Sequence, residues 1–398
     1  MRSPEAHIDR KTLTWARTTA GLDVEAAAKK LAVSPDTLRA WEEESGKRPT
    51  VKQLRKAARL YHRPMCLFFL PSLPDDADSI HDFRRISGAG DLGLTPALRF
   101  EIRLARERRE EALELARDLR QPPAGFAERA SLDDDPEVLA TRLRQRLGVS
   151  LADQTGWQSK YDGFNSWRAA IERLGALVFQ TGATPSLRVE PNEARGFSIA
   201  DKPFPVIVVN GSDPVTARSF TLIHELAHIV LRNGGVCDLH HTVSPRNEVD
   251  RVEVFCNRVA GAVLVPAEAL RVTGVVLHHG ASVSWSDDEI GQLARRFWVS
   301  WEVVLRRLLI VGKTTKDFYD GWRNNRRDKY PERVDTGEPH LKMPVRVVRR
   351  HGRLFPKLVL EGYDEAVLTA HEAASYLNAG PEHLEDIRVE VFESKYAS

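Results

Sequence analysis

The segment RSFTLIHELAHIV at 218–230 constrains this chain more than any other, because His224, Glu225 and His228 form an H-E-x-x-H pattern inside it. Positions i and i+4 lie on one face of a helix, so both imidazoles can reach one metal ion while the glutamate addresses a water on that ion. The surrounding residues are too apolar for a surface helix. The pattern predicts the central helix of a zinc hydrolase, and the alternative is a buried helix whose histidines are only hydrogen-bonded.

A catalytic zinc site normally takes three protein ligands, so a third ligand must lie elsewhere in the chain. The extended pattern with a later histidine is absent, because Gly234 stands at that position and Leu231 stands where the pattern needs glycine. Downstream, residues 253–266 read as a second apolar helix with one well-placed carboxylate, Glu253. We therefore predict a site formed by the two histidines and this glutamate.

Both predicted helices resemble the ImmA/IrrE family of metallopeptidases. The similar residues are FTLIHELAH at 220–228 and E-x-x-C-N-x-x-A-x-x-x-L-x-P at 253–266. The predicted strands RGFS at 195–198 and PVIVVN at 205–210 are similar as well, and the resemblance extends from about residue 165 to 270.

The resemblance implies a zincin-like domain with a small mixed sheet beside the H-E-x-x-H helix. It implies that His224, His228 and Glu253 hold zinc and that Glu225 is the general base, as in a gluzincin-like endopeptidase. One departure is that alanine is commoner in the family where Cys256 stands. The implied substrate is a transcriptional repressor or an antitoxin-like regulator, cleaved in response to stress or mobile-element signals.

Size and composition fit a globular protein of two or three domains, with 398 residues of which 42% are hydrophobic. Lys and Arg number 58 against 56 Asp and Glu, so nucleic-acid binding would need a local basic face. The three cysteines, Cys66, Cys237 and Cys256, show no repeated spacing, which favours a reducing compartment. No stretch approaches the roughly 20 apolar residues of a membrane span. We therefore expect a cytoplasmic protein without a membrane partner.

The amino-terminal part carries four short helical patterns between residues 8 and 62. Ser34 suits a helix N-cap and Pro35 the first helical position, so a helix is predicted to begin there. The spacing predicts a helix-turn-helix bundle, and residues 27–42 resemble the XRE and Cro family of DNA-binding domains.

By that resemblance, the helix at 35–43 would enter the major groove of DNA. Base edges would then lie near Asp36, Thr37 and Arg39, and phosphates near Lys47, Arg48 and Lys52. Bundles of this type also dock proteins, and the acidic run 42–44 opposes a nucleic-acid surface. DNA and a protein therefore both remain possible partners of this domain.

Further elements follow from periodicity and from turn residues. The apolar segment 65–71 is expected to pack the first domain on the next, and the loop 71–78 to form the domain boundary. Helices are predicted at 96–120, 136–147, 163–174 and 289–309, and short strands at 176–180, 196–200 and 206–210.

Between the two metal helices, residues 234–241 contain a Cys-x-x-His-His cluster. Its glycines favour a mobile loop over the cleft, whose His240 or His241 could stabilise an oxyanion. A second metal site is the alternative, although its further ligands are missing.

The carboxy-terminal part is expected to begin with a solvated, basic linker at 318–342. The tail is expected to form a small α/β region from segments 345–349 and 357–361, a helix around 372–377, and segment 389–392.

These elements predict a multidomain α+β protein. The predicted parts are a helix-turn-helix domain at 1–70, a linker and helical region at 71–160, a zincin-like metallopeptidase domain at 161–312, and a linker with a small carboxy-terminal domain at 313–398.

The leading functional hypothesis is a zinc-dependent endopeptidase that acts on a regulatory protein, with the first domain binding DNA or the target. A rival hypothesis is a DNA-binding transcriptional regulator whose peptidase-like domain senses a ligand or partner.

Overall fold

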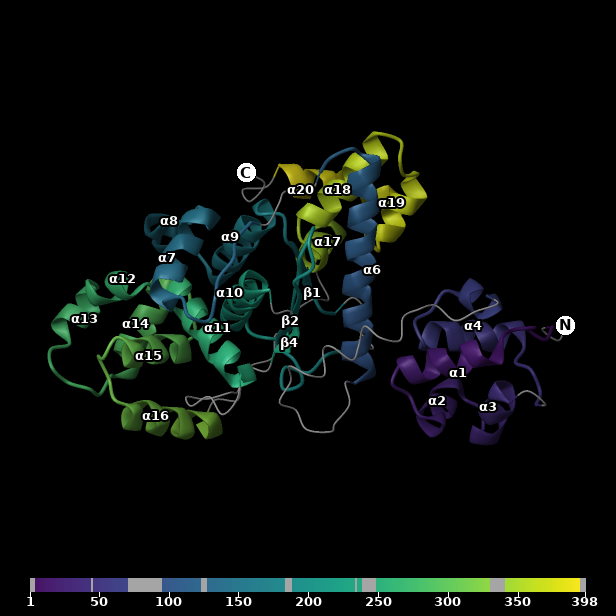
Figure 1. Ribbon diagram of the computed structural model, residues 1–398, viewed down its shortest axis with the longest axis horizontal. Helices are drawn as coiled ribbons and strands as arrows, with labels where there is room; N and C mark the ends of the chain where they lie inside the picture. The colour runs from purple at the N-terminus through teal and green to yellow at the C-terminus, as the bar shows by residue number, and fades with distance from the viewer. Residues whose placement is uncertain are drawn as a thin grey trace. The chain divides into compact units, whose positions relative to one another are not determined.

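A computed structural model of the protein describes residues 4–43, 46–70, 95–122, 127–182, 188–232, 235–237, 248–329 and 341–393. The chain divides into two compact units, Met1–Leu104 and Ala105–Ser398. The smaller unit is helical, and the larger unit combines helices with a small mixed sheet (Figure 1), which confirms the predicted α+β class. The loop 71–78, predicted as the domain boundary, lies outside the described residues. No helix in the described ranges has the length and apolar character needed to cross a bilayer.

The smaller unit packs short helices around one apolar core. Its elements are α1 (Arg10–Thr19), α2 (Val24–Leu31), α3 (Pro35–Glu42), α4 (Val51–Leu60) and the 3-10 helix η1 (Met65–Phe69). Helix α3 starts as predicted, because the Ser34 side chain accepts a hydrogen bond from the Thr37 backbone N–H and proline occupies the first turn. The large buried side chains of this core include Leu13, Trp41 and Tyr61. The relation of this bundle to helix-turn-helix domains stays a prediction.

A buried ion pair joins α1 to α3. Arg17 donates from Nε and Nη2 to the two carboxylate oxygens of Glu42 at 2.7 and 2.8 Å, and from Nη1 to the Leu22 carbonyl. Both side chains are only 9% exposed. Removing one partner would leave an uncompensated buried charge, so the pair fixes the packing of the two helices. Glu42 is therefore neutralised inside the bundle.

The larger unit is built on a four-stranded sheet in the order β1-β3-β2-β4. The strands are β1 (Leu177–Gln180), β2 (Gly196–Ile199), β3 (Val206–Val209) and β4 (Gly235–Cys237). Strand β1 runs parallel to β3, whereas β2 pairs antiparallel with both β3 and β4. The first three strands were predicted. The fourth lies where a mobile loop was predicted, so that prediction is wrong for 235–237, and residues 238–241 lie outside the described residues.

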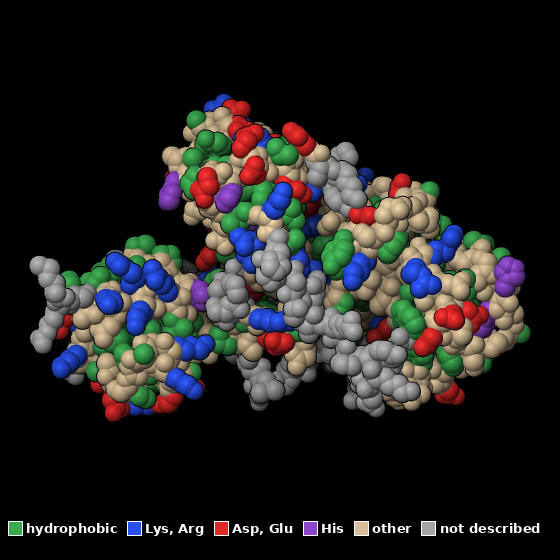
Figure 2. All heavy atoms as spheres, turned by 180° about the vertical axis from the view of Figure 1, so that it is seen from behind, with side chains coloured by type: hydrophobic (Ala, Val, Ile, Leu, Met, Phe, Trp, Pro, Cys, Tyr) green, Lys and Arg blue, Asp and Glu red, His purple; other side chains and the backbone are tan. Residues whose placement is uncertain are grey.

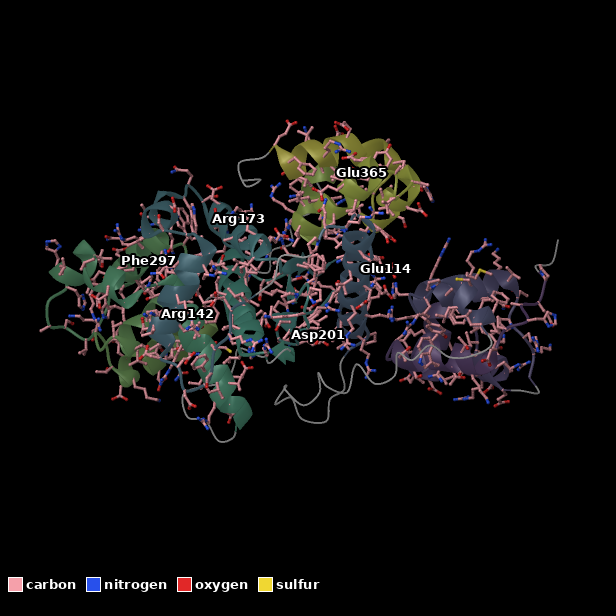
Figure 3. The ribbon with its side chains drawn as sticks, turned by 45° about the horizontal axis from the view of Figure 1, so that its top comes forward. Glu114, Arg142, Arg173, Asp201, Phe297 and Glu365 are labelled. Atoms are coloured by element: carbon pink, nitrogen blue, oxygen red, sulfur yellow. The ribbon has the colours of Figure 1, made fainter. Side chains whose placement is uncertain are left out.

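The remaining helices follow, and the first of them, α6, begins in the smaller unit and continues in the larger one. They are α6 (Pro96–Asp118), α7 (Pro136–Leu147), α8 (Leu151–Gly156), α9 (Lys160–Arg173), α10 (Val215–Leu231), α11 (Glu248–Leu264), α12 (Ala267–Arg271), α13 (Gly274–His278), α14 (Asp287–Phe297), α15 (Trp301–Ile310), α16 (Lys316–Lys329), α17 (Met343–His351), α18 (Leu354–Asp364), α19 (Ala370–Tyr376), the 3-10 helix η2 (Pro381–His383) and α20 (Leu384–Phe392). Helix α10 packs on α11, α9 and the sheet, and Phe297 at the end of α14 is buried in the same core (Figure 3).

Two helices replace the single helix predicted at 289–309. Helix α14 ends at Phe297, because the next residue, Trp298, has a φ of +54°. Ser300 then caps α15 by accepting a hydrogen bond from the Val303 backbone N–H. The predicted linker is also wrong over its first part, because α16 is a packed helix. Tyr319 is buried there and donates its hydroxyl to the Glu302 carboxylate at 3.1 Å. Because α16 carries many charged residues, its narrow aromatic face was not recognised in the sequence as the buried side of a helix.

The described carboxy-terminal region is entirely helical, so the predicted α/β region is wrong. Segments 345–349, 357–361 and 389–392 lie in α17, α18 and α20. Their β-branched residues suggested extended structure, but local propensity is weak against packing. Val347 and His351 are buried one turn apart on α17, and this helix packs against β1.

Two buried polar side chains of α9 hold α17 and α18 in place. Glu172 accepts hydrogen bonds from the backbone N–H groups of Arg353 and Leu354 at 2.9 and 3.3 Å, and burial raises the pKa of this carboxyl. Arg168 donates to the Val348 and Arg349 carbonyls. These bonds satisfy backbone groups at the junction of the two helices, which would otherwise be buried without partners.

Gly352 lies at this junction, and we expect Gly352→Ala to destabilise the larger unit strongly. Its φ is +73°, and a Cβ would overlap the Glu172 carboxylate and lie 2.8 Å from the Val178 carbonyl oxygen. Its ψ of −159° places the backbone in a region that only glycine occupies readily, so alanine there costs about 1–3 kcal/mol, and the overlap should add about 1–3 kcal/mol. Denaturant unfolding followed by tryptophan fluorescence measures the loss.

Gly312→Ala is the matched control. Gly312 has the same φ of +73°, but nothing lies within 4 Å of its added Cβ. It should therefore show the cost of a positive φ without the overlap. Equal losses of unfolding free energy in the two variants would contradict the packing described for the α17–α18 junction.

Candidate metal centre

Helices α10 and α11 pack side by side and bring the predicted site residues together. Helix α10 is almost wholly buried, and its C-cap residue Arg232 adopts a left-handed conformation with φ 57°. His224, Glu225 and His228 are each 0% exposed. Helix α11 presents Glu253, 2% exposed, to the face that carries both histidines. The apolar surroundings that were evident in the sequence therefore place three polar side chains in a buried site.

The three predicted ligands converge on one point. The Nε2 atoms of His224 and His228 are 3.1 Å apart. Glu253 Oε2 lies 3.3 Å from the first imidazole nitrogen, and Oε1 lies 3.3 Å from the second. Tetrahedral zinc with bonds of about 2.0–2.1 Å to nitrogen and oxygen separates its ligand atoms by about 3.3–3.4 Å. The spacing and the donor set of two imidazoles and a carboxylate therefore fit one small divalent cation.

The electrostatics of Glu253 favour its charged form. Burial alone would raise the pKa of this carboxyl, but hydrogen bonding and charge interactions with His224 and His228 outweigh burial and hold the pKa far below its usual range. A buried carboxylate of this kind needs positive charge beside it. Either protonated imidazoles or a bound cation can supply that charge at this position.

Glu225 lies next to this group and against strand β2. A Cβ added to Gly196 would meet the Thr221 side chain at 2.6 Å and Glu225 Oε1 at 3.4 Å, so glycine is required for the close approach of the strand to α10. Burial raises the pKa of Glu225, whereas the two imidazoles and the Ser198 hydroxyl on β2 lower it. A buried carboxylate with a raised pKa is suited to accept and return a proton.

The end of α11 is anchored by three side chains that lie far away in the sequence. Arg144 donates to the Val263 carbonyl at 2.7 Å, Gln154 to Leu264 at 2.8 Å and Arg307 to Val265 at 2.8 Å. These are carbonyls that a helix end leaves without partners, and the two guanidinium groups also match the negative end of the helix dipole. The anchoring fixes α11, and with it the carboxylate that faces α10.

Cys256 and Asn257 lie one turn beyond Glu253 on α11, and both are buried. Burial raises the pKa of the Cys256 thiol, which interacts with His228. The Asn257 Oδ1 atom has no hydrogen-bond partner among the described residues. The position where the ImmA/IrrE resemblance departs from the common alanine therefore lies directly beside a predicted ligand.

Several other predicted site residues lie outside this group. The candidate oxyanion residues His240 and His241 are outside the described residues. In the smaller unit, Asp36 forms an ion pair with Arg39 at 3.0 Å, and the Thr37 hydroxyl is hydrogen-bonded to Ser34. Among the predicted phosphate contacts, Arg48 is 3.1 Å from His7 Nδ1, and Lys47 and Lys52 are exposed. Their roles toward DNA stay predictions.

Sequence reasoning did not assign Gly196, Ser198 or Thr221 to the surroundings of Glu225. Two signals could have found them. A glycine inside a short apolar strand indicates close approach of another element, and a threonine four residues before the motif glutamate lies on the same helix face. Arg144, Gln154 and Arg307 gave no local signal, because the carbonyl groups that they bind lie far away in the sequence.

Comparison with protein families finds a model that matches the segment containing this site. Residues 172–309 match the model of peptidase family M78, described as the IrrE N-terminal-like domain. The matched segment is less than half of the 398-residue chain, and it contains both histidines, Glu225 and Glu253. No curated protein matches the chain. The segment that builds the candidate metal centre is therefore similar to a peptidase domain, in agreement with the resemblance to ImmA/IrrE proteins.

Proposed function

We propose that the protein is a zinc-dependent endopeptidase of the gluzincin type. The observation that carries the proposal is the convergence of His224, His228 and Glu253, with atoms 3.1–3.3 Å apart in a buried site. The match of residues 172–309 to a peptidase family supports the same reaction class. Two imidazole nitrogens and one carboxylate form a donor set typical of zinc. Calcium would instead require about six to eight oxygen ligands.

The proposed roles follow from the positions of the side chains. His224, His228 and Glu253 would hold zinc, which when bound supplies Lewis acidity toward the scissile carbonyl and toward water. Glu225 is next to the first ligand and buried, so its carboxylate would take a proton from the attacking water. The raised pKa lets the same group hold that proton and donate it to the leaving amine.

Strand β4 offers a place for an extended substrate. Among the described strands it is the edge of the sheet, and it pairs antiparallel with β2, which lies against Glu225. The opposite edge strand β1 is covered by α17 and α18. A peptide added along β4 would gain main-chain hydrogen bonds. The proposed substrate is a protein segment in a repressor or an antitoxin-like regulator, and the smaller unit would bind DNA or this target.

We expect Glu225→Gln to abolish proteolysis while zinc binding remains. Glutamine keeps the shape of the side chain but cannot accept a proton from water, so turnover should fall by about 10²–10⁴-fold. The measurement compares new protein amino termini, identified by mass spectrometry, in cells that express the wild-type protein or the variant. Metal analysis of the purified variant should still find zinc.

Glu268→Gln is the matched control, because Glu268 is an exposed residue of α12 that pairs with Arg271 at the surface. It should leave the set of new amino termini unchanged. If wild-type and Glu225→Gln cells show the same cleavage products, the peptidase proposal is wrong. If transcriptional control is also unchanged in the variant, the rival reading as a DNA-binding regulator with a sensor domain is favoured.

A second prediction concerns the third ligand. Glu253→Gln replaces a charged oxygen ligand by a neutral amide, so zinc affinity should fall by more than the roughly 10- to 100-fold that loss of a supporting group costs. Competition with a chromophoric chelator measures the affinity. Zinc should raise the melting temperature of the wild-type protein and have little effect on the variant, because only a ligand that binds the folded state stabilises it.

The Glu268→Gln protein again serves as the control and should bind zinc like the wild type. Equal zinc affinity of Glu253→Gln and wild type would remove Glu253 from the site. The proposal of a His2Glu centre would then fail, even if the histidine pair still bound metal.

A further inference from the structure

The smaller unit has an uneven distribution of charge along its sequence. Residues 46–63 contain no Asp or Glu, and their basic residues are Lys47, Arg48, Lys52, Arg55, Lys56, Arg59 and Arg63. By contrast, residues 4–43 mix both signs. Their acidic residues are Glu5, Asp9, Asp23, Glu25, Asp36, Glu42 and Glu43, and their basic residues are Arg10, Lys11, Arg17, Lys29, Lys30 and Arg39. Positive charge is therefore concentrated on α4 and its flanks.

Helix α4 turns four of these cations to solvent on one face. Lys52, Arg55, Lys56 and Arg59 are all exposed, and their spacing of i, i+3, i+4 and i+7 forms one stripe. The opposite face of the helix packs in the core through Leu54 and its neighbours. The stripe is about 10 Å long at 1.5 Å per residue. Figure 2 shows Lys and Arg side chains gathered in this region of the smaller unit.

Three of these cations, Arg55, Lys56 and Arg59, are available to a partner, whereas Arg39 of α3 is compensated. Within the described part of the chain, no side-chain hydrogen bond or ion pair engages Arg55, Lys56 or Arg59. On α3, Arg39 is paired with both Asp36 and Glu25. The field of α4 therefore extends into solvent, while the predicted recognition helix presents nearly balanced charge.

We propose that this α4 basic face, formed by Lys52, Arg55, Lys56 and Arg59, binds the phosphodiester backbone of double-stranded DNA. This inference rests on the proposed DNA role of the smaller unit, and it is independent of the peptidase reaction. A regular row of flexible cations suits a regular row of phosphates, and such contacts position a protein on DNA without reading its sequence.

The composition of the face argues against other occupants. No apolar residue of α4 is exposed between the cations, whereas protein interfaces are centred on buried apolar or aromatic anchors. Helix α4 also carries no aromatic residue, and binding of single strands relies on aromatic side chains that stack on bases. A duplex backbone needs neither of these features.

The test uses the full-length protein and a fluorescent 30-base-pair duplex of arbitrary sequence, with anisotropy titrations at several salt concentrations. The triple variant Arg55→Ala, Lys56→Ala, Arg59→Ala removes three of the four cations of the stripe, and alanine preserves the helix. Its affinity at low salt should fall by roughly 10- to 100-fold, and the slope of log affinity against log salt should flatten by about two to three, since each phosphate contact contributes about 0.9.

The matched control removes three exposed lysines of α1 and α2, Lys11→Ala, Lys29→Ala and Lys30→Ala. It makes the same change in net charge, and it should bind within about twofold of wild type with an unchanged salt slope. Equal weakening in both triple variants would mean that only total charge matters, which would overturn the proposal.

Three further results would overturn it. Wild-type affinity in the α4 triple variant would show that the face is not used. Competition by single-stranded DNA or by polyglutamate as strong as that by unlabelled duplex would assign the face to another partner. Loss of binding in Thr37→Ala, Arg39→Ala with none in the α4 variant would place the contacts on α3, and the proposed DNA role of the unit would then stand without this inference.

Discussion

The structure of the larger unit depends on the packing of two buried helices that bring one carboxylate against two imidazoles. Burial of Glu253 between His224 and His228 is costly unless positive charge compensates it. An ion held by all three groups would remove that cost and explain why three polar side chains sit in an otherwise apolar core. The nearby Glu225 can then serve a chemical role without disturbing the charge balance of the group.

The surrounding fold maintains this arrangement from both sides. Strand β2 approaches α10 closely because Gly196 has no side chain, and Arg144, Gln154 and Arg307 fix the far end of α11. Both helices are thus held by elements that contribute nothing to the ligand set. Support of this kind is what a metal site requires, because a small displacement of a ligand weakens both binding and catalysis.

Strong local signals allowed much of the fold and of the candidate site to be predicted from the sequence. Helix α10 was expected at 218–230 and extends over Val215–Leu231, since its apolar pattern and motif are unambiguous. The helices at the carboxy terminus were mistaken for an α/β region, because their valines favour strands until packing against β1 is known. Strand β4 was missed because it has only three residues, too few to show the alternation of apolar and polar side chains that marks a strand. The side chains that anchor the end of α11 act through contacts between residues distant in sequence, which one amino-acid sequence does not reveal.

X-ray absorption spectroscopy of the zinc-loaded wild-type protein tests the central claim most directly, because it reports the atoms bonded to the ion. The account predicts two imidazole nitrogens and carboxylate oxygen at about 2.0–2.2 Å. Cys256 lies beside His228, so a different site would be visible as a sulfur neighbour at about 2.3 Å. A sulfur ligand, or a shell with fewer than two imidazoles, would contradict the proposed centre.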